Sequence, residues 1–298
     1  MGIPEAQLTT WAKQGSVTGS SDTYNTVKDA LEAAGTPYSG KNYSVYLQGS
    51  YGNTTNIYAE SDVDVVICLH DCFQSDRAGL PLEQQAQWES AHPGSAAYGH
   101  VEFKADVVKV LKDKFGQGVE PGNKAVFIPA FGSRRNADVI VAIDFKRYSK
   151  FNSLNDQSFV QGICFYDGSS RRIANYPKQH RENLTKRHQD SNEWLKPMTR
   201  IMKNARTKLV DDGVIEAGIA PSYYLEGLLY NAPLDCFGIS YNSSLQKVLQ
   251  WMYDTQDISK WVTANEQYYL LWDDTPTAWQ KANYATFKNA IIELWNNW

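Results

Sequence analysis

The spacing of apolar residues predicts alternating helices and strands in the first 175 residues. One helix can be capped by Ser21 or Asp22 and ends near Gly35; its apolar positions are Val27, Ala30, Leu31 and Ala34. A second amphipathic helix is predicted over 101–115. Runs rich in β-branched residues predict strands at 43–48, 62–69, 124–129 and 137–145, with a further short one at 163–166. The polar, glycine-bearing segment 49–56 is predicted to be a turn, and 79–99 is polar with one weak helical patch.

The pattern changes after Pro177, where strand signals fade and helical spacing continues to Trp298. We therefore expect an α+β fold in which residues 1–175 form a lobe built on a mixed sheet and residues 176–298 form a helical lobe. The helix near the N-terminus is expected to span both lobes. The cleft between the lobes is the expected place for an active site.

Composition and charge narrow the class of protein. The chain has 298 residues, of which 42% are hydrophobic and 21% charged, as in ordinary globular proteins. A net charge of −4 argues against a surface committed as a whole to nucleic acid, although a local basic groove remains compatible with it. No apolar run is long enough for a signal peptide or a membrane span, and the four cysteines form no disulfide framework, so we expect a cytoplasmic protein. The five histidines show no metal-binding spacing and are expected at the surface or in loops.

Three aspartates carry the candidate chemistry. Asp62 and Asp64 lie two apart in a predicted strand, so their carboxylates share one face. Like charges on an apolar strand repel each other, and a divalent cation such as Mg²⁺ or Mn²⁺ resolves that cost. A two-ion site for phosphoryl or nucleotidyl transfer needs a further carboxylate, for which we choose Asp138. Asp144 competes with it because it shares the same strand parity, and Glu60 shares the parity of the first pair; both are expected to be structural.

The segment before these aspartates offers groups that bind phosphate. Gly49 lets the backbone approach a triphosphate, and the following N–H groups and the Ser50 hydroxyl can donate to its oxygens. Gly-Ser alone is weak evidence, and a lone Asp-x-Asp is more often a solvated strand end. Their combination with a later aspartate on a strand favours nucleotide chemistry.

The order of these motifs resembles that of the polymerase-β-like nucleotidyltransferases. The local sequence resembles that of the CD-NTases of CBASS anti-phage systems, the bacterial relatives of cyclic GMP-AMP synthase. The matching segments are Tyr46-Leu47-Gln48-Gly49-Ser50-Tyr51 and Ser61-Asp62-Val63-Asp64. The resemblance continues through Asn175-Tyr176-Pro177-Lys178, Lys203-Asn204-Ala205-Arg206 and Ala220-Pro221-Ser222-Tyr223-Tyr224-Leu225-Glu226. It extends to about Asn231 and is closest to clade E.

This resemblance implies an enzyme that makes a cyclic dinucleotide from nucleoside triphosphates without a template. UTP and ATP are the expected substrates, and cyclic UMP-AMP or cyclic di-UMP the expected products, with two Mg²⁺ or Mn²⁺ ions as cofactors. It also implies a monomer, no nucleic-acid template, no membrane, and regulatory or effector proteins of CBASS as partners. The alternatives are a purine product (cyclic di-GMP or cyclic GMP-AMP), transfer to another acceptor such as an RNA end, and a degenerate nucleotide-binding regulator.

The same resemblance suggests residues that bind the nucleotides. Gln48, Gly49 and Ser50 would hold the donor, together with Lys203 and Ser222 against its phosphates and Tyr223 stacked on a base. Asn175 would read uracil, since its amide matches the O4 and N3–H edge. Each has a structural alternative: a solvated face in the basic segment 176–208, a core aromatic for Tyr223, and a helix cap for Asn175.

Overall fold

The computed structural model describes residues 2–58 and 62–298, which divide into two compact units. The sheet unit consists of Thr18–Gln48 and Asp62–Pro177. The helical unit consists of Met1–Val17, Gly49–Ser61 and Lys178–Trp298. Both units are therefore discontinuous in sequence. The domain boundary predicted at residues 175–176 stays a prediction.

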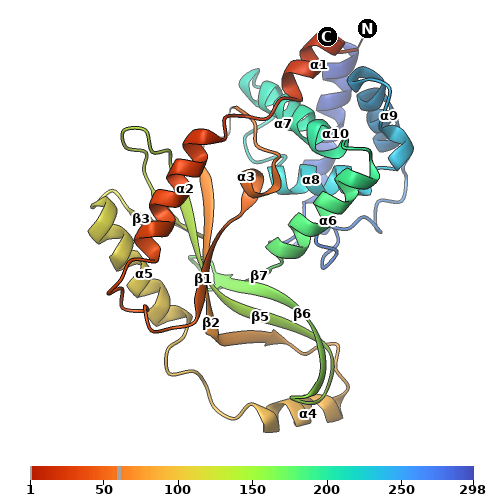
Figure 1. Cartoon of the computed structure of the whole chain (residues 1–298). Helices are drawn as coiled ribbons and strands as arrows, with labels where there is room; N and C mark the ends of the chain where they lie inside the picture. The colour runs from red at the N-terminus through yellow and green to blue at the C-terminus, as the bar shows by residue number, and fades with distance from the viewer. Residues whose placement is uncertain (1, 59–61) are drawn as a thin grey trace. The chain divides into compact units, whose positions relative to one another are not determined.

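The described strands of the sheet unit form one mixed sheet of seven strands (Figure 1). Its central path runs β1-β2-β5-β4-β3, while β6 pairs with β5 and β7 with β6. β2 and β5 are parallel, and the other pairs are antiparallel. The strands are β1 (Tyr43–Leu47), β2 (Val63–Asp76), β3 (Glu120–Pro121), β4 (Val126–Ile128), β5 (Ala137–Ser153), β6 (Asp156–Tyr166) and β7 (Arg172–Asn175). The predicted mixed sheet is confirmed.

The long central strands follow from their sequences. Apart from the half-buried Asp64, the residues from Val63 to Ile67 in β2 are β-branched and buried, which suits a strand covered on both faces. The register between β2 and β5 shifts between Leu69 and Phe73, because residues 70–72 bulge out while Leu69 pairs with Ile143 and Phe73 with Asp144. The strands predicted at 62–69, 137–145 and 163–166 are present but extend further than their apolar cores indicated.

Three helices belong to the sheet unit. α2 (Thr18–Leu31) and α5 (His100–Phe115) contact each other and both central strands. They bury apolar residues at helical spacing, Val27 and Leu31 from α2 and Phe103, Val107 and Leu111 from α5. α4 (Leu82–Ala91) occupies the weak helical patch and contacts β5. The helix predicted over 101–115 is confirmed. The earlier helix is also present, but it begins at Thr18, so Ser21 and Asp22 lie inside it and the predicted cap is wrong.

The helical unit confirms the helical character predicted after Pro177. Its helices are α1 (Glu5–Trp11), α3 (Gly49–Asn53), α6 (Pro177–Asp190), α7 (Leu195–Asp211), α8 (Ser222–Asn231), the short 3₁₀ helix η1 (Leu234–Cys236), α9 (Tyr241–Asp254) and α10 (Lys281–Asn296). α7 is central and buries residues such as Met198, Ile201 and Met202. The prediction of a turn at 49–56 is wrong in part, because Gly49–Asn53 is helical.

The segment around α1 is held by contacts distant in sequence. The Glu5 carboxylate accepts hydrogen bonds from the backbone N–H groups of Tyr241 and Asn242 at the start of α9, at 2.9 and 2.7 Å. These two donors are among those that a helix leaves without an intrahelical partner. Among the described residues, no helix combines the length and apolar character needed to cross a bilayer.

Candidate active site

Two of the predicted aspartates are direct neighbours in the sheet. Asp64 in β2 and Asp138 in β5 are partners in the parallel register. Partners in register point to the same face, so the two carboxylates stand side by side. Asp62 precedes β2 by one residue, and its Oδ1 accepts a hydrogen bond of 3.1 Å from the Asn136 amide. The sequence placed these residues on two strands, and the fold brings the strands together.

The carboxylates interact electrostatically. Partial burial and the negative charge of Asp62 both raise the pKa of Asp138. Hard divalent cations prefer carboxylate oxygens as ligands, and their charge offsets the repulsion between neighbouring carboxylates. The donor set formed by Asp62, Asp64 and Asp138 therefore fits Mg²⁺ or Mn²⁺.

The two competing carboxylates differ in position. Asp144 accepts a hydrogen bond from the His70 ring at 2.9 Å and lies six residues further along β5 from Asp138. That separation corresponds to roughly 20 Å along a strand. Glu60 lies outside the described residues.

Gln48 and the two residues after it mark a transition between the units. The Gln48 N–H donates to the Asp64 carbonyl at 2.9 Å and continues the ladder beyond β1. Gly49 then adopts a φ of 68°, in the left-handed region where a side chain would be strained. Ser50 follows as the second residue of α3. The glycine is thus required by the backbone at the point where the strand becomes a helix.

The end of α3 is fixed by one buried carboxylate. Glu226 in α8 is only 3% exposed. Its carboxylate accepts hydrogen bonds from the Asn53 amide at 3.0 Å, from the Thr55 hydroxyl, and from the His180 ring at 2.7 Å. Glu226 therefore ties the segment after Gly49-Ser50 to α6 and α8.

Lys203 belongs to the same buried network. Its side chain is fully buried, and its Nζ lies 3.7 Å from Glu226 Oε1. Burial by itself would raise the pKa of Glu226, but the His180 hydrogen bond, the Lys203 charge and the Thr55 hydroxyl outweigh it and lower that pKa to about 2. Glu226 is therefore an anion at neutral pH, as an interior partner of a buried lysine must be.

Half-buried cations lie along α6 and α7. Burial and the neighbouring charge of Arg181 lower the pKa of Lys196, and Arg200 adds to this effect. Arg200 donates to the carbonyl oxygens of Ala12 and Thr54 at 2.5 and 2.7 Å. Cations that crowd one another favour an anion beside them, so this part of the predicted basic segment can bind phosphate.

Ser222 and Tyr223 open α8. Ser222 is the first helical residue, after Pro221. The Tyr223 hydroxyl accepts a hydrogen bond of 2.9 Å from the Asn265 amide, and its ring stacks on His180 with centroids 4.9 Å apart. One face of Tyr223 thus packs against a protein ring, which fits the alternative role as a packed aromatic residue.

Asn175 is the last residue of β7, and only Tyr176 separates it from α6. Its Oδ1 accepts a hydrogen bond of 2.8 Å from the Tyr176 N–H. The amide is thereby oriented, while its oxygen keeps a second lone pair and its nitrogen two donor hydrogens. In register, Asn175 pairs with Ile163, which pairs with Asp144. These three residues therefore lie on one face of the sheet. Asp144 and Asp138 are six residues apart on β5, so this is also the face that carries Asp138 and its partner Asp64.

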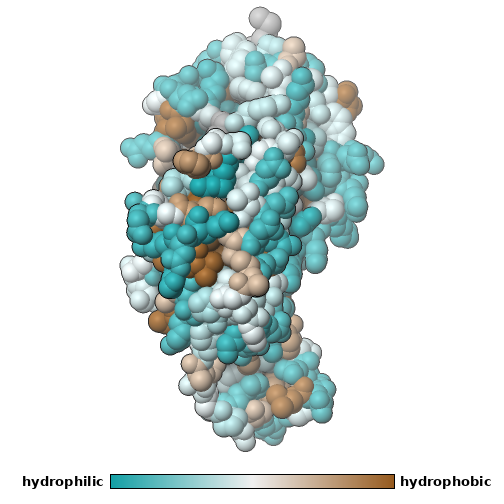
Figure 2. Space-filling model, turned by 60° about the vertical axis from the view of Figure 1, so that its left-hand side comes forward, coloured by the Kyte–Doolittle hydropathy of each residue, from teal (hydrophilic) through white to brown (hydrophobic). Residues whose placement is uncertain are grey.

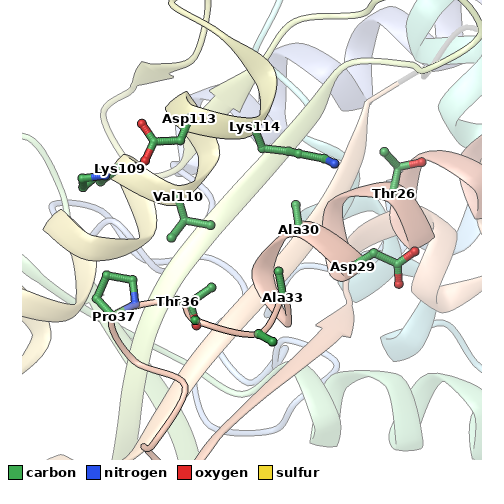
Figure 3. Close-up of a pocket in the computed structure, with 12 residues that line it drawn as sticks. Thr26, Asp29, Ala30, Ala33, Thr36, Pro37, Lys109, Val110, Asp113 and Lys114 are labelled. Atoms are coloured by element: carbon green, nitrogen blue, oxygen red, sulfur yellow. Dashed lines mark hydrogen bonds and ion pairs between the residues drawn. The ribbon is translucent and has the colours of Figure 1, made fainter.

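A separate hollow of about 550 Å³ lies in the sheet unit between α2 and α5 (Figure 3). Its lining includes Thr26, Asp29, Lys109, Asp113 and Lys114. None of the residues predicted to handle nucleotides lines it. On the face that Figure 2 shows, the surface is largely hydrophilic and the hydrophobic residues form small, separate patches.

The network around Glu226 joins residues that are distant in sequence, so local spacing does not predict it. The prediction that the histidines lie at the surface or in loops is wrong for His100 and His180, which are buried. In the sequence, Glu226 is only the last residue of the segment 220–226 that resembles the CD-NTases, and no role was predicted for it. A glutamate in the middle of an apolar helix, Leu225 to Leu229, is the signal that indicates a buried and paired carboxylate.

The chain is similar in sequence and in fold to proteins of known activity. Residues 182–296 match the C-terminal helical domain of cGAS/DncV-like nucleotidyltransferases. A cyclic UMP-AMP synthase of Rhodothermus marinus is 36% identical, with 100% of this chain and 99% of that protein aligned. Its structure with Apcpp and Upnpp superposes with a TM-score of 0.88 over 99% of this chain and 97% of that one. A cyclic dipyrimidine nucleotide synthase CdnE of Legionella pneumophila is 32% identical (96% and 95% covered), and a cyclic dipurine nucleotide synthase of Elizabethkingia meningoseptica 30% (95% and 95%).

Proposed function

The chain belongs to the CdnE clade of the CD-NTases, the nucleotidyltransferases that make cyclic dinucleotides, and we propose that its product contains uridine. UTP and ATP are the proposed substrates, and cyclic UMP-AMP or cyclic di-UMP the proposed product. The observation that carries this function is the pairing of Asp64 with Asp138 on one face of the sheet, with the Asp62 charge beside them. As family members do, the enzyme would work in CBASS anti-phage defence, as a cytoplasmic monomer with a CBASS effector as partner.

Enzymes of this family generally use divalent metal ions. Asp62, Asp64 and Asp138 are the residues proposed to hold two Mg²⁺ or Mn²⁺ ions. When bound, such ions stabilise charge on phosphoryl oxygens and lower the pKa of a coordinated hydroxyl group. The role of the protein is to hold the three carboxylates close together in their ionised form. Burial, and after it the charge of Asp62, raise the pKa of Asp138, so a cation at this place would favour its ionised form.

The reaction forms two phosphodiester bonds in succession. In each, a ribose hydroxyl attacks an α-phosphate in line, the bond to the β-phosphate breaks, and one pyrophosphate and one proton leave. The linear intermediate must re-enter with its roles exchanged before the ring can close. No template takes part, so the protein itself must position the two nucleotides, and this positioning contributes to the rate enhancement.

The donor phosphates are assigned to Gly49, Ser50, Lys203 and Ser222. Gly49 leaves room for an oxygen because it has no Cβ, and Ser50 and Ser222 each provide a hydroxyl at the start of a helix. Lys203 is proposed to attract the donor phosphates; its ammonium is fully buried beside Glu226, whose negative charge offsets part of that attraction. Gln48 and Tyr223 complete the proposed nucleotide contacts.

Base choice is assigned to Asn175. Its amide can donate to O4 of uracil and accept from N3–H while its Oδ1 also bonds Tyr176. Relatives of this chain include a dipyrimidine synthase and a dipurine synthase, so a purine product is the alternative. Cytosine presents the opposite edge and would need the amide to turn.

The identity of the product tests the proposal. The purified chain is incubated with all four ribonucleoside triphosphates and Mg²⁺ or Mn²⁺, treated with phosphatase, and its resistant products are weighed by mass spectrometry. We expect a cyclic dinucleotide with at least one uridine. A cyclic product that contains only purines would overturn the base assignment and leave the chemistry intact, whereas transfer of label to an RNA or a protein would overturn the cyclic product.

Replacement of Asn175 tests base choice separately. Asn175→Ala removes the amide that faces the base, and the loss of one or two hydrogen bonds should reduce uridine incorporation relative to purine by about 3- to 10-fold. The measurement is the ratio of products when UTP and GTP compete in equal amounts. Asn152→Ala is the matched control, since the amide of that exposed asparagine donates a surface hydrogen bond of 2.7 Å to Asp156. An unchanged ratio would remove Asn175 from base selection.

A further inference from the structure

We propose that Cys68, His70 and Asp144 form a zinc-binding site, separate from the catalytic aspartates. The three side chains come from β2 and β5, and their Sγ, ring nitrogen and carboxylate oxygen all lie within 4.8 Å of one another. His70 Nδ1 is 2.9 Å from Asp144 Oδ1, and Cys68 Sγ is 3.6 Å from the same oxygen. Ligand atoms at such separations can share one cation at metal–ligand distances of about 2.0 to 2.3 Å.

The backbone is built to create this arrangement. Up to Leu69 the two strands pair in simple register, and residues 70–72 then bulge out before Phe73 pairs with Asp144. Because of this bulge, His70 has no partner in β5 and its ring lies beside Asp144. Bulges commonly redirect a side chain toward a site in this way.

A fourth residue fixes the histidine ring. Ser44 in β1 pairs with Cys68, and its Oγ is 2.9 Å from His70 Nε2. Histidines that bind metals usually give their second ring N–H to such a partner. In the metal-free chain the His70 Nδ1–H donates to Asp144, and on metal binding this proton is found on Nε2 instead, where it donates to the Ser44 hydroxyl, so that the Nδ1 lone pair can bind the cation. Binding of the cation then releases the Cys68 thiol proton to solvent, and the imidazole proton resides on Nε2.

The ligand types select the metal. Thiolate, imidazole and carboxylate are together the donors of zinc sites, and three protein ligands leave a fourth position for water. Mg²⁺ prefers oxygen alone, so it would favour the catalytic aspartates over this site. Cys68 is buried, but the side chains of His70 and Asp144 are 25% and 18% exposed, which gives the ion a route of entry.

Zinc here would stiffen the sheet close to the residue proposed to read the base. Asp144 pairs with Ile163 and Ile163 with Asn175, so the three form one row across β5, β6 and β7. A cation bound by Cys68 and His70 of β2 and by Asp144 of β5 would link the two strands beside the bulge, at one end of this row. We therefore expect zinc to raise the thermal midpoint of the folded chain by several degrees.

Cobalt binding provides a direct test. The full chain is stripped with a chelator and titrated with Co²⁺, whose thiolate charge-transfer band in the near ultraviolet reports a Cys ligand, and Zn²⁺ is then added in competition. We expect one Co²⁺ per chain with that band, its displacement by Zn²⁺, and its loss in Cys68→Ser and His70→Ala. Ser44→Ala should keep the band and weaken affinity by about 10- to 100-fold.

Matched controls separate this site from its surroundings. Cys164 pairs with Ile143 and so faces the opposite side of the sheet, which makes Cys164→Ser the cysteine control; it should keep the band. The double variant Asp62→Ala/Asp64→Ala should also keep it, so a failure of the catalytic proposal would leave this result standing. No band in the wild-type chain, or an equal band in a folded Cys68→Ser variant, would overturn the zinc site. Circular dichroism of each variant verifies folding.

Discussion

Asp64→Asn is expected to reduce formation of the cyclic product by on the order of 10³-fold or more. The asparagine has nearly the same size and shape as the aspartate but removes one negative charge from the cluster of Asp62, Asp64 and Asp138, in which Asp64 pairs with Asp138. Metal-assisted stabilisation of a transition state amounts to several kcal/mol, and about 1.4 kcal/mol corresponds to a tenfold change in rate. The measurement is the initial rate of pyrophosphate release with UTP and ATP.

Asp113→Asn is the control for this variant. Asp113 is 65% exposed and forms a surface pair with Lys109, so its replacement should leave the rate nearly unchanged. The thermal midpoint of Asp64→Asn should not fall, because removal of one charge relieves repulsion with Asp62 and Asp138. A folded Asp64→Asn enzyme that keeps wild-type activity would exclude these aspartates from catalysis.

Glu226→Gln is expected to cost the folded chain roughly 3–5 kcal/mol of stability. The glutamine fills the same space but leaves the buried Lys203 ammonium without its anion, the costly outcome when one member of a buried pair is removed. In a chain of this size the midpoint of thermal unfolding should fall by roughly 10 °C. Glu266→Gln is the control, because Glu266 is exposed and its carboxylate accepts a surface hydrogen bond from the Tyr230 hydroxyl. Equal midpoints for the two variants would contradict the role of Glu226.

The same residue makes a pH dependence predictable. Its pKa falls from an ordinary value of 4.5 to about 2 in the folded chain, so the folded state binds this proton less readily than the unfolded state. The stability that Glu226 contributes is therefore complete above pH 4.5 and is lost as the pH falls from about 4.5 to about 2. Unfolding midpoints measured across this range should drop more steeply for the wild-type chain than for Glu226→Gln. Parallel curves would show that other groups control acid unfolding.

Periodicity was sufficient for much of the fold because local spacing determines which face a residue occupies. The parity of Asp62 and Asp64 in an apolar run predicted a shared face, and the β5 run predicted a strand for Asp138. The parallel pairing of β2 with β5 then brings Asp138 beside Asp64, which the spacing of residues alone does not predict. No comparable local signal existed for β7, which has only four residues, or for α3, where Gly49-Ser50 begins a short helix that glycine usually disfavours.

Contacts between distant residues account for what the sequence did not reveal. Thr55 and Glu226 are 171 positions apart, and His70 and Asp144 are 74 apart, so no spacing rule relates them. The bulge at residues 70–72 has the same cause, because it is defined only against β5. Buried ionic groups and bulges are decided by tertiary packing, whereas strand and helix periods are decided locally.

The division of the helical unit into three sequence segments affects how the chain can fold during synthesis. The residues of the sheet unit are complete once residue 177 has emerged from the ribosome. The segments 1–17 and 49–61 must wait, because Glu5 binds the start of α9 and α3 is fixed through Asn53 and Thr55 by Glu226. At about 5–20 residues per second this interval lasts several seconds, during which early segments have no native partner. The helical unit can therefore assemble only after the residues of α8 and α9 have been synthesised.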